Sequence, residues 1–244
     1  MKLRKVAFAV LGALCCAAAG AAEKPKSFNL WLHADITIDD SGHVTALDWT
    51  DAEPGRQLVA TRITPNVQAW EFVPAIVDGQ PMETRTALSI GVRATEQDDG
   101  SISLQVTDAH TGPKTDVMSP PMYPRDGFRS GVSASVKVDL EVQADGRAEV
   151  LGMTFDSDSR TGHRNLFLKA TRQAVATWKF RPEFVANRAV KTRMQVPVDF
   201  CLQGSPLCKK LDALRRIADR PANMPIALDS AVAFKTDFRA AAIP

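Results

Sequence analysis

The fold is decided by the stretch Ala174-Val-Ala-Thr-Trp-Lys-Phe-Arg-Pro-Glu-Phe-Val-Ala-Asn-Arg-Ala-Val-Lys-Thr-Arg-Met-Gln-Val-Pro-Val-Asp-Phe200. Its pattern predicts the end of a helix, a corner at Pro182, a turn at Asn187 and then a strand, because proline fixes φ and asparagine tolerates φ > 0. Apolar and polar residues then alternate, as in a half-buried β-strand. The face expected to be buried holds Val190, Thr192, Met194, Val196, Val198 and Phe200.

Much of this stretch occurs twice in the chain. A W-x-F-x-P corner followed by an alternating strand is found 108 residues earlier, between Val67 and Val92. We interpret the recurrence as an internal duplication. The matching residues are Trp70, Phe72, Pro74 and Arg85 in the first copy and Trp178, Phe180, Pro182 and Arg193 in the second.

Each copy is expected to contain two strands joined by a tight turn, then a helix, then a third strand. In the first copy Pro65 predicts a kink or a late helix start, and an added strand at 101–106 is expected to cover the edge of the sheet. The first copy's strands are expected at 28–39, 44–49 and up to about 94, with a helix at 56–70. The second copy's strands are expected at 132–142, 148–155 and 190–200, with a helix at 163–179.

The fold class that follows is α+β, with two small domains. Each is expected to be an antiparallel sheet of three strands or slightly more, with a helix packed on one face. A short amphipathic helix at 209–219 and a strand near 231–234 are expected in the tail. The expected divisions are a signal peptide at 1–22, a first domain at 26–107, a linker at 108–119, a second domain at 120–202 and a C-terminal helix and tail at 203–244.

The N-terminal residues have the pattern of a secretory signal peptide. Lys2, Arg4 and Lys5 precede an apolar run, and Ala19-Gly-Ala21 is a small-residue cleavage site. The alternative is that residues 6–22 stay in place as a membrane anchor. Removing the three basic residues changes the formal net charge from +2 to −1, so the mature chain has no basic excess and no nucleic-acid partner is expected.

Two cysteines follow the signal peptide, Cys201 and Cys208. In an exported protein, a pair this close in sequence predicts a disulfide. The four histidines, His33, His43, His110 and His163, are scattered and have no metal-ligand spacing. The sequence contains no nucleophile elbow, phosphate loop or dinucleotide motif, so no catalytic residue, cofactor or metal is expected.

Four segments of the second copy carry a resemblance to a known family. They are Pro121-x-Tyr123-Pro124, the turn ending at Arg147, the run from Ala170 to Pro182 and the strand Val196-Pro-Val-Asp-Phe200. Over residues 119–202 the chain resembles the TonB C-terminal domain family, and the first copy is a degenerate version. The resemblance implies that the domain binds a periplasmic segment of an outer-membrane receptor as an added strand beside its third strand.

The sequence therefore predicts a non-catalytic periplasmic binding or scaffold protein whose partner is a protein, and whose open edge strands also allow a homodimer. One alternative is a membrane-anchored transducer for outer-membrane transport, although the chain has no long Pro-rich spacer to cross the periplasm. A second is a small-ligand carrier or an enzyme with a site between the domains. The candidate partner-binding residues are Lys191, Arg193, Gln195, Val196 and Asp199 on the last strand of the second domain.

Overall fold

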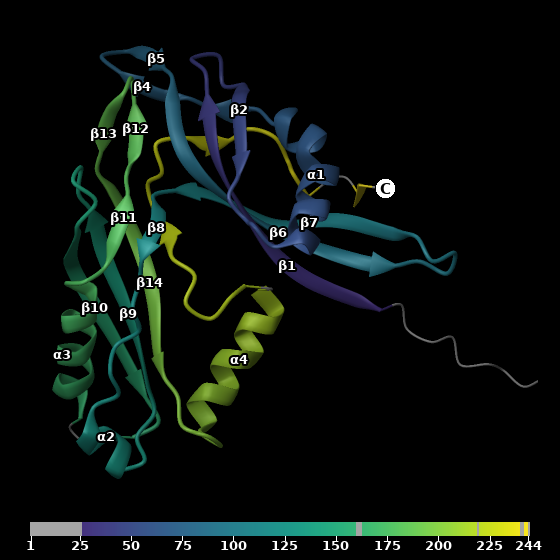
Figure 1. Ribbon diagram of the computed structural model, residues 1–244. Helices are drawn as coiled ribbons and strands as arrows, with labels where there is room; N and C mark the ends of the chain where they lie inside the picture. The colour runs from purple at the N-terminus through teal and green to yellow at the C-terminus, as the bar shows by residue number, and fades with distance from the viewer. Residues whose placement is uncertain (1–25, 160–162, 219, 240–241, 244) are drawn as a thin grey trace, which may run out of the picture.

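The computed structural model describes residues 26–159, 163–218, 220–239 and 242–243. The expected signal peptide lies outside the described residues. The described chain forms two larger antiparallel sheets and three two-stranded ones, with helices packed against the larger sheets, which is the α+β class that the sequence predicts (Figure 1).

The first sheet is built on its longest strands. β1 (Ser27–Ile38) lies between β2 (Val44–Trp49) and β6 (Thr84–Glu96), and both pairs are antiparallel. β7 (Ile102–Gly112) pairs with the other edge of β6 from Ala87 to Glu96. The added strand expected after the third strand is therefore present, and it covers the edge of β6 along most of its length.

Helix α1 (Pro54–Gln68) packs on this sheet and buries Ala60, Ile63 and Val67. The helix begins at Pro54, where proline is well tolerated, and continues through Pro65. The late start expected near Pro65 is therefore wrong. Ile63 and Val67 are fully buried on either side of Pro65, and burying two such side chains contributes roughly 3–6 kcal/mol, which offsets the roughly 3 kcal/mol cost of an internal proline.

The second sheet has the strand order β10-β9-β14-β15. α3 (Arg164–Val175) packs on β9 and β10 and buries Phe167, Leu168, Thr171, Ala174 and Val175. The expected alternation is confirmed on β14, since every second residue from Thr192 to Phe200 is buried. The other members of this unit are β9 (Ala134–Val142), β10 (Ala148–Ser157), β14 (Thr192–Phe200), β15 (Ile226–Ala227) and the short helix α2 (Arg125–Arg129).

The two units share their corner geometry. In each unit, the W-x-F-x-P corner is followed directly by a short hairpin. The two turn residues of each hairpin have positive φ; they are Asp78 and Gly79 in the first unit and Ala186 and Asn187 in the second. The hairpins are β4 (Ala75–Val77) with β5 (Gln80–Met82), and β12 (Glu183–Val185) with β13 (Arg188–Val190), so their bounds differ by 108 positions. The duplication itself remains a prediction.

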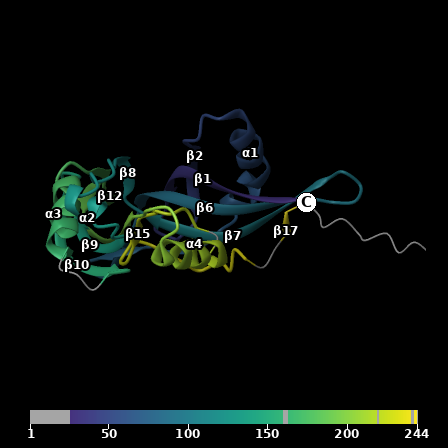
Figure 2. The same cartoon turned by 90° about the horizontal axis from the view of Figure 1, so that it is seen from below.

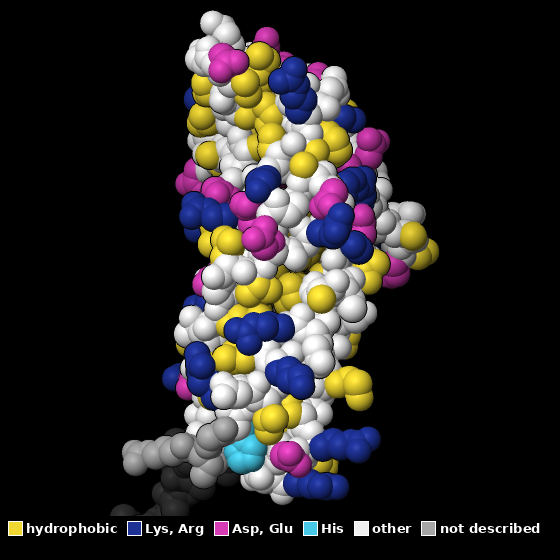
Figure 3. Space-filling view, turned by 90° about the vertical axis from the view of Figure 1, so that its left-hand side faces the viewer, with side chains coloured by type: hydrophobic (Ala, Val, Ile, Leu, Met, Phe, Trp, Pro, Cys, Tyr) yellow, Lys and Arg dark blue, Asp and Glu magenta, His cyan; other side chains and the backbone are white. Residues whose placement is uncertain are grey.

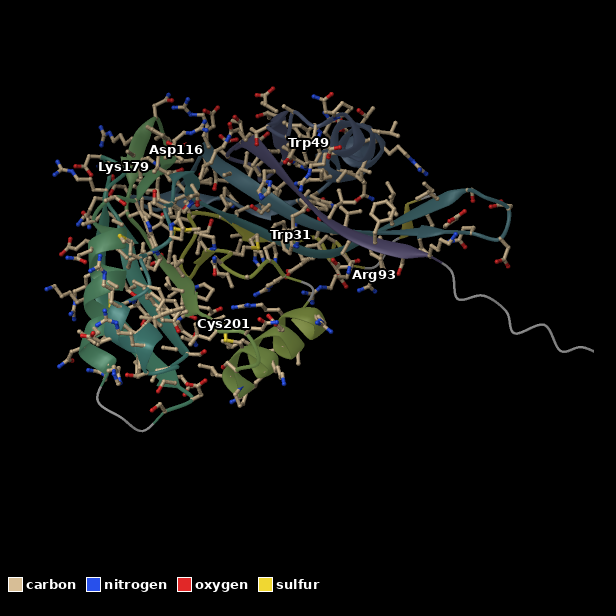
Figure 4. All side chains as sticks on the ribbon, turned by 60° about the horizontal axis from the view of Figure 1, so that its bottom comes forward. Trp31, Trp49, Arg93, Asp116, Lys179 and Cys201 are labelled. Carbon is tan, nitrogen blue, oxygen red and sulfur yellow. A yellow bond between two sulfur atoms is a disulfide. The ribbon has the colours of Figure 1, made fainter. Side chains whose placement is uncertain are left out.

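The segment expected to be a linker, 108–119, is mostly strand. Residues 108–112 belong to β7, and β8 (Lys114–Val117) pairs with β11 (Lys179–Arg181) of the second unit. The polar composition of this segment was misleading because backbone pairing, rather than an apolar face, holds it in place. Asp116 and Lys179 lie together at this joint (Figure 4).

The units also meet through the second hairpin, because β12 pairs with Thr84 and Arg85 at the start of β6. On the surface, Asp35 of β1 binds Lys114 at 3.2 Å and Arg181 at 3.1 Å. Acidic and basic side chains are mixed around the middle of the face shown in Figure 3. The first sheet is thus continued by a hairpin of the second unit.

The chain after β14 forms α4 (Pro206–Ala218) and then returns across both units. We call residues 220–239 the C-terminal strap. The strap includes β15 and β16 (Ala233–Phe234), and β16 pairs with β3 (Phe72–Val73). Figure 2 shows α4 and α1 on opposite sides of the first sheet. β17 (Ala242–Ile243) pairs with β7.

Candidate functional site

β14 carries the five candidate partner-binding residues, and the structure places them in different environments. Val196 is fully buried in the core of the second unit, so its side chain faces away from any partner on the edge. Gln195 is half-buried and donates from Nε2 to Asp139 at 2.8 Å. Lys191 and Arg193 are exposed, and Lys191 lies just before the strand, 3.3 Å from Glu141.

Asp199 is bound by two other residues of the same chain. It accepts a hydrogen bond from the Ser135 hydroxyl at 2.6 Å and forms an ion pair with Arg215 of α4. Burial lowers the pKa of Arg215. The far end of β14 is therefore joined to α4 through the contact between Asp199 and Arg215.

The outer edge of β14 is not open, because the strap occupies part of it. β15 pairs antiparallel with β14, placing Ala227 opposite Met194 and Ile226 opposite Gln195. The Leu228 amide donates to the Arg193 carbonyl at 2.8 Å. The expectation of an open edge at this point is thus corrected, since the strap satisfies the main-chain groups that an edge strand leaves unpaired.

Arg193 and Asp229 complete this contact. The Arg193 amide donates to Oδ1 of Asp229 at 2.6 Å, and Nε of Arg193 donates to Oδ2 at 2.7 Å. The hydrogen bond with Asp229 raises the pKa of Arg193. Among the five candidates, only Arg193 forms hydrogen bonds to the strap with both its backbone and its side chain.

Glu183 fastens the strap to both units. Its carboxylate is fully buried and accepts hydrogen bonds from Thr86 of the first sheet at 2.7 Å and from Thr192 of the second at 2.7 Å. The Ser230 hydroxyl donates to it at 2.8 Å, and the Ala231 amide donates at 3.1 Å. A buried carboxylate is costly unless hydrogen bonds satisfy its oxygens, and here the donors come from three separate parts of the chain.

Asp108 anchors the strap at its start. It is buried and accepts a 2.6 Å hydrogen bond from Nε of Arg220. Burial raises the pKa of Asp108, but the hydrogen bonds from His110 and Arg220 outweigh it and lower the pKa to about 2. Trp31 stacks on His110 at 6.0 Å between ring centroids.

The other end of the strap is held by aromatic packing. Phe234 lies 4.8 Å from Phe72 and 5.9 Å from Trp70, and Phe238 lies 5.7 Å from Trp70, measured between ring centroids. Lys235 forms a 2.6 Å ion pair with Glu71. The corner of the first unit is therefore covered by the strap, whereas the corner of the second unit is covered by β8.

The predicted disulfide between Cys201 and Cys208 is present, with the two Cα atoms 5.7 Å apart. It closes the turn between β14 and α4, and Cys201 lies close to the end of α4 from which the helix starts (Figure 4). The bond therefore sets the direction in which the chain leaves β14.

A cavity of about 540 Å³ lies between the two units. Its size falls in the range of small-molecule sites. It is bounded by the first sheet, by β14 and by the strap. The side chains around it include His33, Leu88, His110, Met118, Met194 and Met224.

Among the described residues, no three His, Cys, Asp or Glu side chains come together as a metal site. His33 lies beside Asp51 and His43 beside Asp39, each on an exposed turn or strand, while His110 packs on Trp31. His163 stands at the start of α3. His33 and His110 stand on either side of Ser89 and line the same cavity, whereas His43 and His163 lie outside its lining.

The comparison with known families decides the identity of the second unit. The family model "Gram-negative bacterial TonB protein C-terminal" matches residues 119–202. Residues 119–202 belong to the TonB C-terminal domain family. The matched region contains α2, β9, β10, α3 and β14, so the third strand of this TonB C-terminal domain is the strand on which the strap lies.

Relatives that carry the name Protein TonB match part of the chain. The one from Xanthomonas campestris pv. campestris is 35% identical over 85 residues, which is 35% of this chain and 36% of the relative. The one from Pseudomonas aeruginosa is 34% identical over 79 residues, which is 30% of this chain and 22% of the relative. The chain therefore spans little more than a third of the first relative and less than a quarter of the second. Among the described residues, no helix is long and apolar enough to cross a membrane.

Sequence reasoning missed the two residues that organise the site, Glu183 and Asp229. Glu183 follows the W-x-F-x-P corner directly and alternates with Val185, which is also buried, so the period-two pattern gave a weak signal that Glu183 faces inward. The equivalent position in the first unit is Ala75. Asp229 had no signal, because β15 is only two residues long.

Proposed function

We propose that this protein is an exported, periplasmic binding module that pairs an extended segment of a protein partner with β14. The observation that carries the proposal is the antiparallel pairing of β15 with β14 in a TonB C-terminal domain. That pairing supports β14 as a strand whose main-chain groups accept an added strand. Main-chain bonds would supply affinity and side chains beside the strand would supply selectivity.

The partner class that fits is a periplasmic segment of an outer-membrane receptor, and the role is a scaffold for outer-membrane transport without a catalytic step. The two relatives named Protein TonB support a link to this system. The alternative role, a membrane-anchored transducer, requires residues 6–22 to remain on the chain. A mature N-terminus at Ala22 or Glu23 in the soluble periplasmic fraction would favour the scaffold, and a start at Met1 in the inner membrane would favour the transducer.

The partner contact is tested by crosslinking in the native cells. A photo-crosslinking residue is placed at Arg193 on β14, and a matched control is placed at Arg85, which stands 108 positions earlier on β6. Both side chains are exposed, but the edge of β6 at Arg85 is covered by β12, which places Phe184 opposite Arg85. We expect a partner adduct from position 193 and none from position 85. Equal adducts from both positions, or none from position 193, would remove β14 as the contact strand.

A second candidate function, carriage of a small apolar ligand, is favoured by the cavity of about 540 Å³ between the units. Three methionines and two histidines around it offer soft, adaptable contacts. Native mass spectrometry of the protein purified from its own cells should then show a bound mass. Replacing Met194 with Trp, to fill the cavity, should remove that mass without unfolding the protein.

A further inference from the structure

The strap shows what kind of segment the edge of β14 accepts. Ile226 and Ala227 run antiparallel to Gln195 and Met194, and the Leu228 amide continues the pairing to the Arg193 carbonyl. The paired segment is short, and Leu228 is largely exposed. Most of the contact is therefore made by main-chain groups, which any extended segment possesses.

Asp229 adds the chemical selection that the main chain lacks. Its two oxygens take the backbone amide and Nε of Arg193 at 2.6 and 2.7 Å. Arg193 and Asp229 remain 59% and 40% exposed as side chains, so the ion pair alone contributes little to stability. Its effect is on selectivity, because a carboxylate satisfies both donors and a basic residue at that position would repel Arg193.

The other polar side chains of β14 do not offer this selection. Gln195 is bound to Asp139, and Asp199 is bound to Ser135 and Arg215, all within the same unit. Arg193 thus provides the charged contact to whatever lies on the edge between residues 193 and 195.

We infer that β14 recognises an antiparallel extended segment with a carboxylate side chain one position beyond the residue opposite Arg193, and that residues 226–229 occupy this place as an internal ligand, with Leu228 opposite Arg193 and Asp229 next to it. The inference rests on the proposed function and names the chemistry of its partner. The strap is fastened on both sides of this segment, by Arg220 to Asp108 and by Ser230 and Ala231 to Glu183. Only the short stretch between these anchors has to leave β14 when a partner binds.

An internal ligand has a high effective concentration, in the millimolar range for a short tether. A free segment of the same sequence therefore competes poorly with it. Weakening the internal segment should expose the edge, and fixing it should close the edge. Both changes can be made in the full chain without altering Arg193.

The probe is a fluorescent peptide with the strap's own sequence, Met224-Pro-Ile-Ala-Leu-Asp-Ser-Ala-Val232. In the released chain, Leu228→Pro removes the amide that bonds to Arg193, and Asp229→Lys removes the carboxylate. A Leu228→Ala chain keeps the amide and is the matched control. The locked chain carries Met194→Cys and Ala227→Cys, which stand opposite each other.

We expect the peptide to bind the released chain at least 10-fold more tightly than the wild-type or Leu228→Ala chain. The oxidised locked chain should not bind it. A peptide with Lys in place of Asp229 should bind the released chain at least 10-fold more weakly, and adding Arg193→Asp to the released chain should reverse that preference. Circular dichroism and an intact Cys201–Cys208 bond establish that each variant is folded.

A folded released chain that does not bind the peptide, or that binds the Asp and Lys peptides equally, would overturn the inference. The crosslinking experiment at Arg193 is independent of this result. Adducts in cells together with failed peptide binding would contradict the internal-ligand assignment and leave the proposed partner function in place. Peptide binding without any adduct in cells would contradict the proposed partner function and leave the selection of a carboxylate by Arg193 in place.

Discussion

Glu183 accepts a hydrogen bond from Thr86 over 2.7 Å, although the two residues belong to different units and are 97 positions apart in the chain. The same carboxylate receives donors from Thr192 and from the strap. The two sheets and the strap are thus joined at one buried acidic group.

Glu183→Gln should lower the free energy of unfolding by about 1–3 kcal/mol, because one oxygen becomes an NH₂ group that faces donors and leaves buried groups unsatisfied. Glu96→Gln, at an exposed position, is the matched control and should change stability by less than about 0.5 kcal/mol. Urea denaturation followed by tryptophan fluorescence measures both. Equal stability of the two variants would show that Glu183 is not a structural hub.

Asp108 should make stability depend on pH in the acid range. Its pKa is lowered to about 2 in the folded protein from an ordinary value of 3.8. Its contribution is complete above pH 3.8 and is lost as the pH falls towards 2, because the unfolded chain then binds the proton first. The difference amounts to about 2 kcal/mol.

Asp108→Asn should remove this contribution, so that stability falls less steeply below pH 4. Asp116→Asn, at an exposed position nearby in sequence, should leave the wild-type slope unchanged. Denaturation curves at several pH values between 2 and 5 compare the three proteins. Parallel curves for wild type and Asp108→Asn would contradict the assignment.

Gly146→Ala should be among the most damaging single changes in the second unit. Gly146 has φ +80°, and an added Cβ would lie 2.1 Å from the Phe180 carbonyl oxygen. Gly204 has a similar φ of +84° but nothing within 4 Å, so Gly204→Ala isolates the backbone cost of about 1–2 kcal/mol. The clash should cost Gly146→Ala about 1–3 kcal/mol more.

Gly42→Ala makes the same test in the first unit, where φ is +91° and the added Cβ would lie 2.1 Å from the Phe72 carbonyl oxygen. Thermal unfolding of the three variants gives the comparison. If Gly146→Ala and Gly42→Ala were no worse than Gly204→Ala, the tight turn-to-corner contact would not be the feature that fixes each unit.

Reducing the Cys201–Cys208 bond, or replacing both cysteines with serine, should lower the free energy of unfolding by about 2–3 kcal/mol on the chain-entropy model for so short a loop. The Ser/Ser variant should not respond to reductant, whereas the wild-type protein should. Urea midpoints with and without reductant measure the difference. An unchanged midpoint for the reduced wild-type protein would mean that the hydrogen bonds of Ser205 already hold this turn.

The features that depend on neighbours in the chain could be predicted from the amino-acid sequence. The period of two on β14, the W-x-F-x-P corner and the positive φ at Asn187 are set within a few residues, by alternation of side chains and by backbone sterics. The disulfide was also predictable, because the short segment between the two cysteines keeps them close together. These local rules gave the α+β class and the family resemblance of residues 119–202.

The segment that pairs with β14 could not be predicted from the sequence, because it depends on contacts between distant parts of the chain. β15 is two residues long, too short for any periodic signal, and it is held by Glu183 and Arg193, which are distant in sequence. No sequence pattern identifies Asp229, because its contact with Arg193 forms only when the strap packs across both units. A main-chain edge can pair with any extended segment, so which segment pairs there is decided by how the whole chain packs, and not by the residues of the edge.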